Sequence, residues 1–127
     1  MEPDTLSSLV LAYLGDAVYE LEVRKFLVEQ GITKVKDLHT AAVKMVKATT
    51  QAKVIHELLP SLDELELAVV KRGRNAKSGT APKNTEVIDY RYATAFEALI
   101  GYWHLKGRQD KIDQAFELAK AGYCSSC

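Results

Sequence analysis

Apolar side chains recur at every third or fourth position along most of the chain, which is the spacing of one face of an α-helix. In the first such segment they are Leu6, Leu9, Val10, Tyr13, Leu14, Ala17, Val18 and Leu21. This spacing predicts a helix over about residues 5–29. Asp4 is placed to cap its start, and Gly31 is placed to end it.

The middle of the chain predicts two further helices and the start of a third. One covers about 34–48, with Thr33 placed to cap it. The next is shorter and ends near Leu59, because Pro60 cannot continue a helix. The sequence SLDE at 61–64 has the form of a capping box, which predicts that another helix begins there.

The last third of the chain begins with a polar segment and then returns to helical spacing. Residues 73–85 read GRNAKSGTAPKNT, and this composition predicts the only long loop. Helical spacing resumes from Tyr90 and is interrupted at Gly107. A final helix is expected over about 109–121, with Gly122 as its stop.

These elements together predict a single all-α domain of six or seven helices. The 127 residues suit one domain, with a core over about 5–121 and a tail at 122–127. Apolar residues make up 47% and charged residues 27%, as in ordinary soluble proteins. The chain starts without the basic segment of a signal peptide, and no apolar run reaches the roughly 18 residues that cross a bilayer. We therefore expect a soluble cytoplasmic protein that does not contact membranes.

Two cysteines, Cys124 and Cys127, lie in the last four residues, and the rest of the chain has none. A disulfide framework is thereby excluded as an organising feature. A single C-x-x-C pair supplies only two of the four ligands of a structural zinc site. We expect this tail to be frayed and without function.

Lone acidic residues in apolar helical segments are the strongest chemical signal in the chain. Asp16 is the only charged residue of 5–19, and Glu97 is the only charged residue of 92–105. Burying a carboxylate is costly unless it meets a cation, a metal ion or strong hydrogen-bond donors. Two such groups that meet across a helix pair would suit Mg²⁺, which prefers oxygen ligands.

Simpler readings of these two acids remain open at this point. Asp16 can be an ordinary exposed helix residue, and Glu97 can pair with a Lys or Arg from another helix. Two glycines favour the metal site, because Gly15 precedes Asp16 and Gly101 lies one turn after Glu97. A glycine inside a helix costs about 1 kcal/mol relative to alanine, and close backbone approach is a common reason for it.

Other candidate groups are less informative. The histidines His39, His56 and His104 lie on separate predicted helices, which favours surface positions over metal ligation. The aromatic residues at helical spacing are expected in the core or in an oligomer interface. They are Tyr13, Tyr19, Phe96, Tyr102 and Trp103.

Positive charge is concentrated in one segment although the chain as a whole is neutral, with 17 basic and 17 acidic residues. Residues 71–84 carry five cations and no anion, with polar side chains between them. Such a set can contact the phosphates and 2′-hydroxyls of duplex RNA, although a solvated loop would look the same. The candidate RNA-binding residues are Arg72, Arg74, Asn75, Lys77, Ser78 and Lys83.

Two short motifs resemble the catalytic domain of the ribonuclease III family. LAYLGDAVYE resembles its Leu-Gly-Asp signature, and FEALIGYWHL resembles its later Glu-Ala-Leu-Ile-Gly segment. The stretch RNAKSGTAPKN and the chain length are similar to the branch that has the nuclease domain without a double-stranded RNA-binding domain. The resemblance covers about residues 5–120.

This resemblance implies a Mg²⁺-dependent endoribonuclease that acts as a homodimer on double-stranded RNA. It further implies maturation of 23S ribosomal RNA ends, products with a 5′-phosphate and a 3′-hydroxyl, and a ribosomal protein that presents the substrate. Asp16 and Glu97 match the family's catalytic, metal-binding acids. Ala12 and Thr94 stand where most members carry two further carboxylates, so a site with fewer protein ligands is expected, with Thr94 acting through water. These departures also leave open the alternative of a non-catalytic relative that binds double-stranded RNA or the ribosome.

Overall fold

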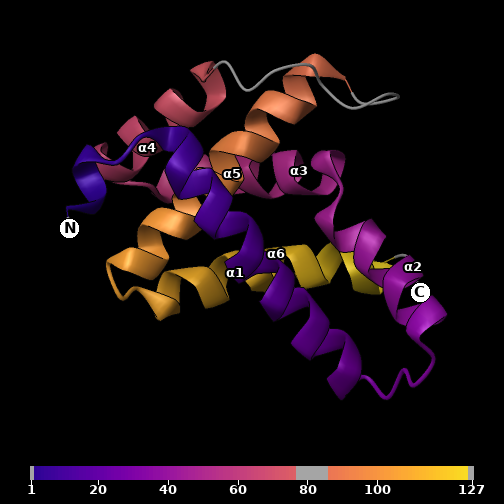
Figure 1. The fold of residues 1–127 in the computed structure, drawn as a ribbon. Helices are drawn as coiled ribbons and strands as arrows, with labels where there is room; N and C mark the ends of the chain where they lie inside the picture. The colour runs from indigo at the N-terminus through magenta and orange to yellow at the C-terminus, as the bar shows by residue number, and fades with distance from the viewer. Residues whose placement is uncertain (1, 77–85, 126–127) are drawn as a thin grey trace.

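Six α-helices make up most of the chain in the computed structural model, which describes residues 2–76 and 86–125 (Figure 1). The described residues contain no strand, which confirms the all-α expectation. Two short 3-10 turns, η1 (Pro3–Thr5) and η2 (Leu59–Ser61), precede α1 and follow α3. The helices are α1 (Ser8–Glu29), α2 (Val35–Val46), α3 (Ala48–Leu58), α4 (Glu64–Asn75), α5 (Val87–Leu105) and α6 (Gln109–Ser125).

Helix α5 lies in the middle of the fold, with α1, α3, α4 and α6 packed around it. Every residue from Ala93 to Trp103 is buried except Glu97, which is partly buried. A helix that is apolar on all sides is stable only when other elements cover all of it. Of the aromatic residues that were expected in the core, Tyr19, Phe96, Tyr102 and Trp103 are buried there.

The backbones of α1 and α5 come into direct contact where the two helices cross. A Cβ atom placed on Gly15 would lie 1.7 Å from the backbone oxygen of Glu97, and one placed on Gly101 would lie 2.1 Å from that of Leu11. Both distances are far inside van der Waals contact, so the two backbones touch only because both positions are glycine. The expectation that these glycines permit close backbone approach is confirmed.

The start of α1 differs from the sequence-based expectation. Its N-cap is Ser7, whose hydroxyl accepts a hydrogen bond from the backbone N–H of Val10 at 3.2 Å. Asp4 instead precedes the helix, and its carboxylate accepts hydrogen bonds from the Tyr102 hydroxyl at 2.8 Å and the Lys106 ammonium at 3.1 Å. Both residue types cap helices well, and tertiary contacts to α5 decide between them.

A capping box does start α4, but it lies two residues later than predicted. The side chain of Asp63 accepts from the backbone N–H of Glu66 at 2.8 Å, and Glu66 accepts from that of Asp63 at 2.9 Å. Ser61 instead donates to the Leu58 carbonyl at the end of α3. The box SLDE and the box DELE both fit the pattern of a cap followed three residues later by an acid. Contacts of Glu66 with other helices favour the second.

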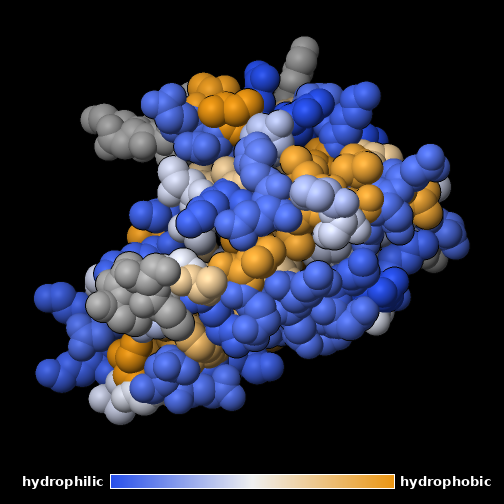
Figure 2. Space-filling view, turned by 180° about the vertical axis from the view of Figure 1, so that it is seen from behind, coloured by the Kyte–Doolittle hydropathy of each residue, from blue (hydrophilic) through white to orange (hydrophobic). Residues whose placement is uncertain are grey.

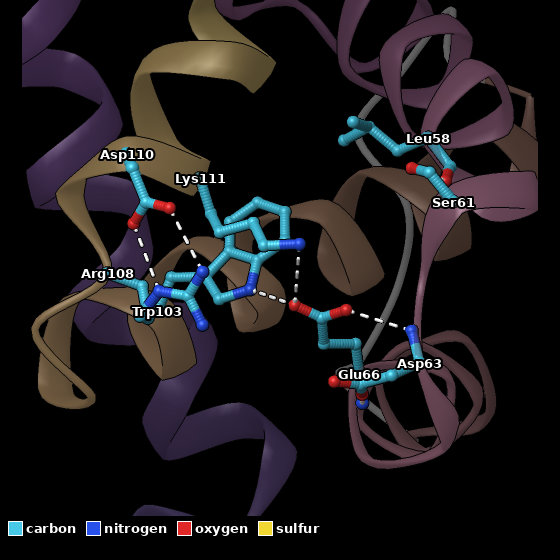
Figure 3. A network of polar contacts seen from close by, with 8 residues as sticks. All are labelled: Leu58, Ser61, Asp63, Glu66, Trp103, Arg108, Asp110 and Lys111. Carbon is cyan, nitrogen blue, oxygen red and sulfur yellow. Dashed lines mark hydrogen bonds and ion pairs between the residues drawn. The ribbon is translucent and has the colours of Figure 1, made fainter.

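Glu66 is buried although it is acidic, because three donors surround its carboxylate (Figure 3). Besides the backbone of Asp63, the indole N–H of Trp103 in α5 donates to it at 2.6 Å. The ammonium of Lys111 in α6 lies 3.8 Å from the same oxygen. One side chain thereby joins α4 to the last turns of α5 and the start of α6.

Several predicted boundaries are wrong by a few residues. Thr33 does not cap α2, whose N-cap is Lys34 without a side-chain hydrogen bond. Helix α5 begins at Val87, ahead of Tyr90, and residues 73–75 of the predicted loop belong to α4. Tertiary packing extends these helices beyond what their local sequence indicates.

The predicted end of α6 is also wrong, since the helix continues past Gly122 to Ser125. A glycine costs only about 1 kcal/mol inside a helix, which packing can exceed. Tyr123 supplies such packing, because its ring lies edge-on to that of Phe26 at 5.5 Å. Cys127 lies outside the described residues.

The glycines expected at two other helix ends do adopt the left-handed conformation there. Gly31 follows α1 with φ of 87°, and Gly107 follows α5 with φ of 72°. Within the described part of the chain, no helix has the length and apolar character that crossing a bilayer would need. The face turned away in Figure 1 is largely hydrophilic, with apolar side chains exposed in separate areas (Figure 2).

Replacing Gly15 by alanine should destabilise the protein severely. The added methyl group has no space against the backbone of α5, so we expect a loss of about 3 kcal/mol or more, at the upper end of overpacking effects. Gly122→Ala is the matched control, because that glycine is also helical but has no atom within 4 Å of an added Cβ. The control should gain about 0.5–1 kcal/mol. Urea denaturation measures both, and equal stability of the two variants would contradict the backbone contact.

Candidate active site

Asp16 and Glu97 come together at the crossing of α1 and α5. The two carboxyl groups are within hydrogen-bonding reach of each other. Asp16 follows Gly15 in α1, and Glu97 carries the backbone oxygen against which Gly15 packs. The glycine contact therefore fixes the separation of the two acids.

The pair lies at the edge of the core and not inside it. Glu97 is partly buried between fully buried neighbours, whereas Asp16 is exposed. The exposure of Asp16 agrees with the alternative that the sequence left open for this residue, because α1 presents Gly15 and Tyr19 to α5 and turns Asp16 toward solvent. A ligand or substrate can therefore approach the pair from the Asp16 side.

Neighbouring packing holds this edge of the core in place. The hydroxyl of Tyr19 donates to the Met45 carbonyl of α2 at 2.7 Å. Its ring lies edge-on to that of Phe96, the residue before Glu97, with centroids 5.0 Å apart. The backbone around both acids is thus tied to a third helix.

The electrostatic environment of Glu97 is unfavourable for its charge. Burial, and after it the hydrogen bond and negative charge of Asp16, raise the pKa of Glu97 to about 8. The nearby charge of Glu20 acts in the same direction. Two carboxyl groups this close hold one proton between them at neutral pH unless a cation takes its place.

No basic side chain supplies that positive charge within the described structure. The ion pairs there involve other acids, so the alternative in which a Lys or Arg neutralises Glu97 is not what is found. Glu20, one turn after Asp16, is itself held by Arg24 at 3.1 Å. The donor set of carboxylate oxygens without a cation fits a hard ion such as Mg²⁺.

Near the Asp16–Glu97 pair, the two positions where the family carries further carboxylates hold Ala12 and Thr94. Across 2–76 and 86–125, no three acidic, histidine or cysteine side chains are grouped in a way that could hold a metal. Ala12 is buried among apolar residues. Thr94 is buried one turn before Glu97, and its hydroxyl donates to the Tyr90 carbonyl at 3.0 Å.

Gln51 of α3 belongs to the site and was missed from the sequence. It is 2% exposed, and its amide is within hydrogen-bonding reach of the Glu97 carboxyl, which lowers the pKa of Glu97. Its spacing in the sequence could have revealed it, because Gln51 precedes the apolar residues Val54, Ile55 and Leu58 by three, four and seven positions. That spacing places a polar amide on the apolar face of the helix.

Three of the candidate RNA-binding residues lie on the last turn of α4. Arg72 and Asn75 are exposed, and Arg74 is partly buried with its guanidinium donating to Asn75 at 3.3 Å. This turn touches the start of α1, because the hydroxyl of Ser8 donates to the Arg72 carbonyl at 3.3 Å. Asp16 lies eight residues further along α1, roughly 12 Å at the rise of an α-helix. The candidates Lys77, Ser78 and Lys83 lie outside the described residues.

The remaining candidates agree with their expected positions. All three histidines, His39, His56 and His104, are exposed, and they lie on α2, α3 and α5. Tyr13 is the exception among the aromatic residues, since 85% of its surface is exposed on α1. A ring this exposed is consistent with the alternative expectation of an oligomer interface.

Comparison with known proteins places this geometry in a family. A sequence model described as the ribonuclease III domain matches residues 9–108. The chain is 58% identical over 112 residues to the Mini-ribonuclease 3 of Desulfitobacterium hafniense, which covers 88% of this chain and 71% of that protein. It is 52% identical over 120 residues to the Mini-ribonuclease 3 of Brevibacillus brevis, covering 94% and 90%.

A solved structure has the same fold. A crystal structure of a protein from Fusobacterium nucleatum superposes with a TM-score of 0.82 at 33% sequence identity, covering 88% of this chain and 91% of that one. The family match spans both acids of the α1–α5 crossing and the end of α4. The chain therefore belongs to the ribonuclease III family, is similar throughout to its Mini-ribonuclease 3 members, and is an endoribonuclease.

Proposed function

We propose that the protein hydrolyses double-stranded RNA with Mg²⁺ held at Asp16 and Glu97. The observation that carries this proposal is the contact of two carboxyl groups, for which the described part of the chain offers no basic partner, at the crossing that the family match includes. Such a pair is a liability for stability unless it has a cation to bind. We further propose the cytoplasmic maturation of 23S ribosomal RNA ends as the biological task, with a ribosomal protein that presents the precursor.

The chain's own groups contribute position and charge to the reaction. Asp16, which is exposed, can reach both the ion and a phosphodiester outside the core. Glu97 is fixed by the packed backbone of α5 and supplies the second carboxylate. When bound, Mg²⁺ supplies an activated water and stabilises the charge that develops on the phosphate. The proposed products carry a 5′-phosphate and a 3′-hydroxyl.

The end of α4 is the proposed RNA-binding surface. Arg72, Arg74 and Asn75 bring positive charge and a polar amide to the same side as the start of α1. We propose that Lys77, Ser78 and Lys83 extend this surface. Phosphates and 2′-hydroxyls are the groups that such residues contact on an RNA duplex.

A homodimer would place two such sites on the two strands of a duplex. Helix α1 exposes apolar side chains at intervals of three to eight residues along one side: Val10, Tyr13, Leu21 and Val28 are 52%, 85%, 58% and 60% exposed. An isologous interface requires a self-complementary apolar patch of this kind. We propose that this patch on α1 forms the interface.

Asp16→Asn should reduce Mg²⁺-dependent cleavage of long duplex RNA by a factor of about 10²–10³. Asn keeps the size of Asp16 but removes its negative charge and so relieves the repulsion with Glu97, which means that the metal-free melting temperature should not fall. RNA binding should be nearly unchanged, because the position is exposed. Asp37→Asn, an exposed position on α2, is the matched control and should cut normally. Retained cleavage in Asp16→Asn would contradict the site. Band shifts without cleavage by the wild-type protein would support the non-catalytic alternative.

Tyr13→Lys should convert the dimer to monomers, because a charge in an apolar isologous interface meets its own copy. Leu65→Lys on α4, where Leu65 is 57% exposed, is the control and should remain dimeric. Sedimentation velocity distinguishes the two states. A stable wild-type monomer at working concentrations would contradict the interface.

Mg²⁺ should stabilise the protein more at about pH 8.5 than at about pH 6, because it must displace the proton of Glu97. Without divalent ions the pH dependence that Glu97 contributes to stability has the opposite sign. The folded pKa of about 8 lies above the ordinary 4.5, so the contribution of Glu97 to stability is fully present below about pH 4.5 and is lost as the pH rises through 8. Thermal melts with Mg²⁺ or a chelator measure both effects.

Glu97→Gln should remove both pH effects, since the amide does not titrate. Glu57→Gln, an exposed position on α3, should retain them. A wild-type protein whose metal-free stability is flat between about pH 5 and pH 9 would contradict the electrostatic account of Glu97.

A further inference from the structure

Gln51 occupies a position where the packing of the protein alone favours an aliphatic residue. It is 2% exposed on α3, and its neighbours on the same face of the helix, Val54, Ile55 and Leu58, are buried. An amide removed from water costs free energy unless its donor and acceptor groups find partners. Leu or Met would fill the same volume without that cost.

The side-chain amide of Gln51 has the Glu97 carboxyl as its partner. It is within hydrogen-bonding reach of the Glu97 carboxyl, and only its NH₂ group can donate to a carboxylate. The contact comes from α3, which packs against α5 independently of α1. Glu97 is therefore held from two sides, by the glycine crossing at its backbone and by Gln51 at its side chain.

We propose that Gln51 is a positioning residue that orients the Glu97 carboxylate toward Asp16 and so preorganises the pair for a divalent cation. This inference rests on the proposed function, since it concerns the metal-binding pair. Groups that hydrogen-bond a metal ligand fix its orientation, and their loss typically costs about 10–100-fold in metal affinity or activity. In a site with only two carboxylates, the orientation of each one has a large effect on metal affinity.

Gln51→Met tests the proposal, because methionine keeps the length and volume but cannot donate a hydrogen bond. Gln51→Leu is a second variant in case methionine packs poorly. Gln114→Met, an exposed position on α6, is the matched control. Melting with a chelator establishes that each variant folds. Binding of Mn²⁺ is then measured by electron paramagnetic resonance, and cleavage of duplex RNA is measured over a range of Mg²⁺ concentrations.

The expected result is a folded variant with metal affinity weakened about 10–100-fold. kcat at low Mg²⁺ should fall, KM for RNA should stay unchanged, and a high concentration of Mg²⁺ should restore most of the rate. Gln114→Met should match the wild-type protein throughout. A Gln51 variant with wild-type Mn²⁺ binding and wild-type Mg²⁺ dependence would overturn the inference, as would a change confined to melting temperature.

The same measurements separate this inference from the proposed function. If the wild-type protein does not cut duplex RNA with Mg²⁺, the proposed function fails. The comparison of Mn²⁺ binding between wild-type protein and Gln51→Met still decides whether Gln51 positions the acid pair. If the wild-type protein cuts and the variant behaves identically, only the inference about Gln51 fails.

Discussion

Direct contact between the backbones of α1 and α5 is the constraint on which the rest of this structure depends. The contact exists because Gly15 and Gly101 each face a carbonyl oxygen of the other helix, leaving no space for a side chain. Helices normally pack with side chains between them, at interaxial distances of 8–10 Å. Removing that layer brings residues next to the glycines within reach of each other, which is how Asp16 and Glu97 meet.

At the α1–α5 crossing, the proposed function requires an acid where stability favours an apolar residue. Packed helices favour apolar residues at their crossing, yet the fold keeps Glu97 there with a pKa of about 8 and with no basic partner among residues 2–76 and 86–125. Glu66 is a buried acid in the same protein whose carboxylate does have donors, because the Trp103 indole and the backbone of Asp63 donate hydrogen bonds to it. The contrast supports a functional reason for leaving the charge of Glu97 unmatched.

The sequence predicts the meeting of Asp16 and Glu97 better than it predicts the ends of the helices. Asp16 and Glu97 can be recognised in the sequence because a charge within an apolar helical segment is rare. Their two glycines can be recognised because a glycine within a helical segment is also rare. Helix ends are decided by contacts that are distant in sequence. Asp4 and Ser7 are both good caps, for example, and the choice depends on Tyr102, almost a hundred residues away.

Gln51 was missed for a related reason. An uncharged polar residue is unremarkable in a short amphipathic helix until the buried face of that helix is known. The partner that explains it lies on α5, which local spacing does not reveal.

The buried carboxylate of Glu66 has a mechanical consequence for the other end of α4. It clamps the first turn of that helix to Trp103 and Lys111, at the end opposite Arg72 and Arg74. A helix of 12 residues is a stiff rod roughly 18 Å long. The direction in which the basic end of α4 points is therefore set largely at its anchored first turn, so the proposed RNA-binding surface is oriented from the opposite end of the helix.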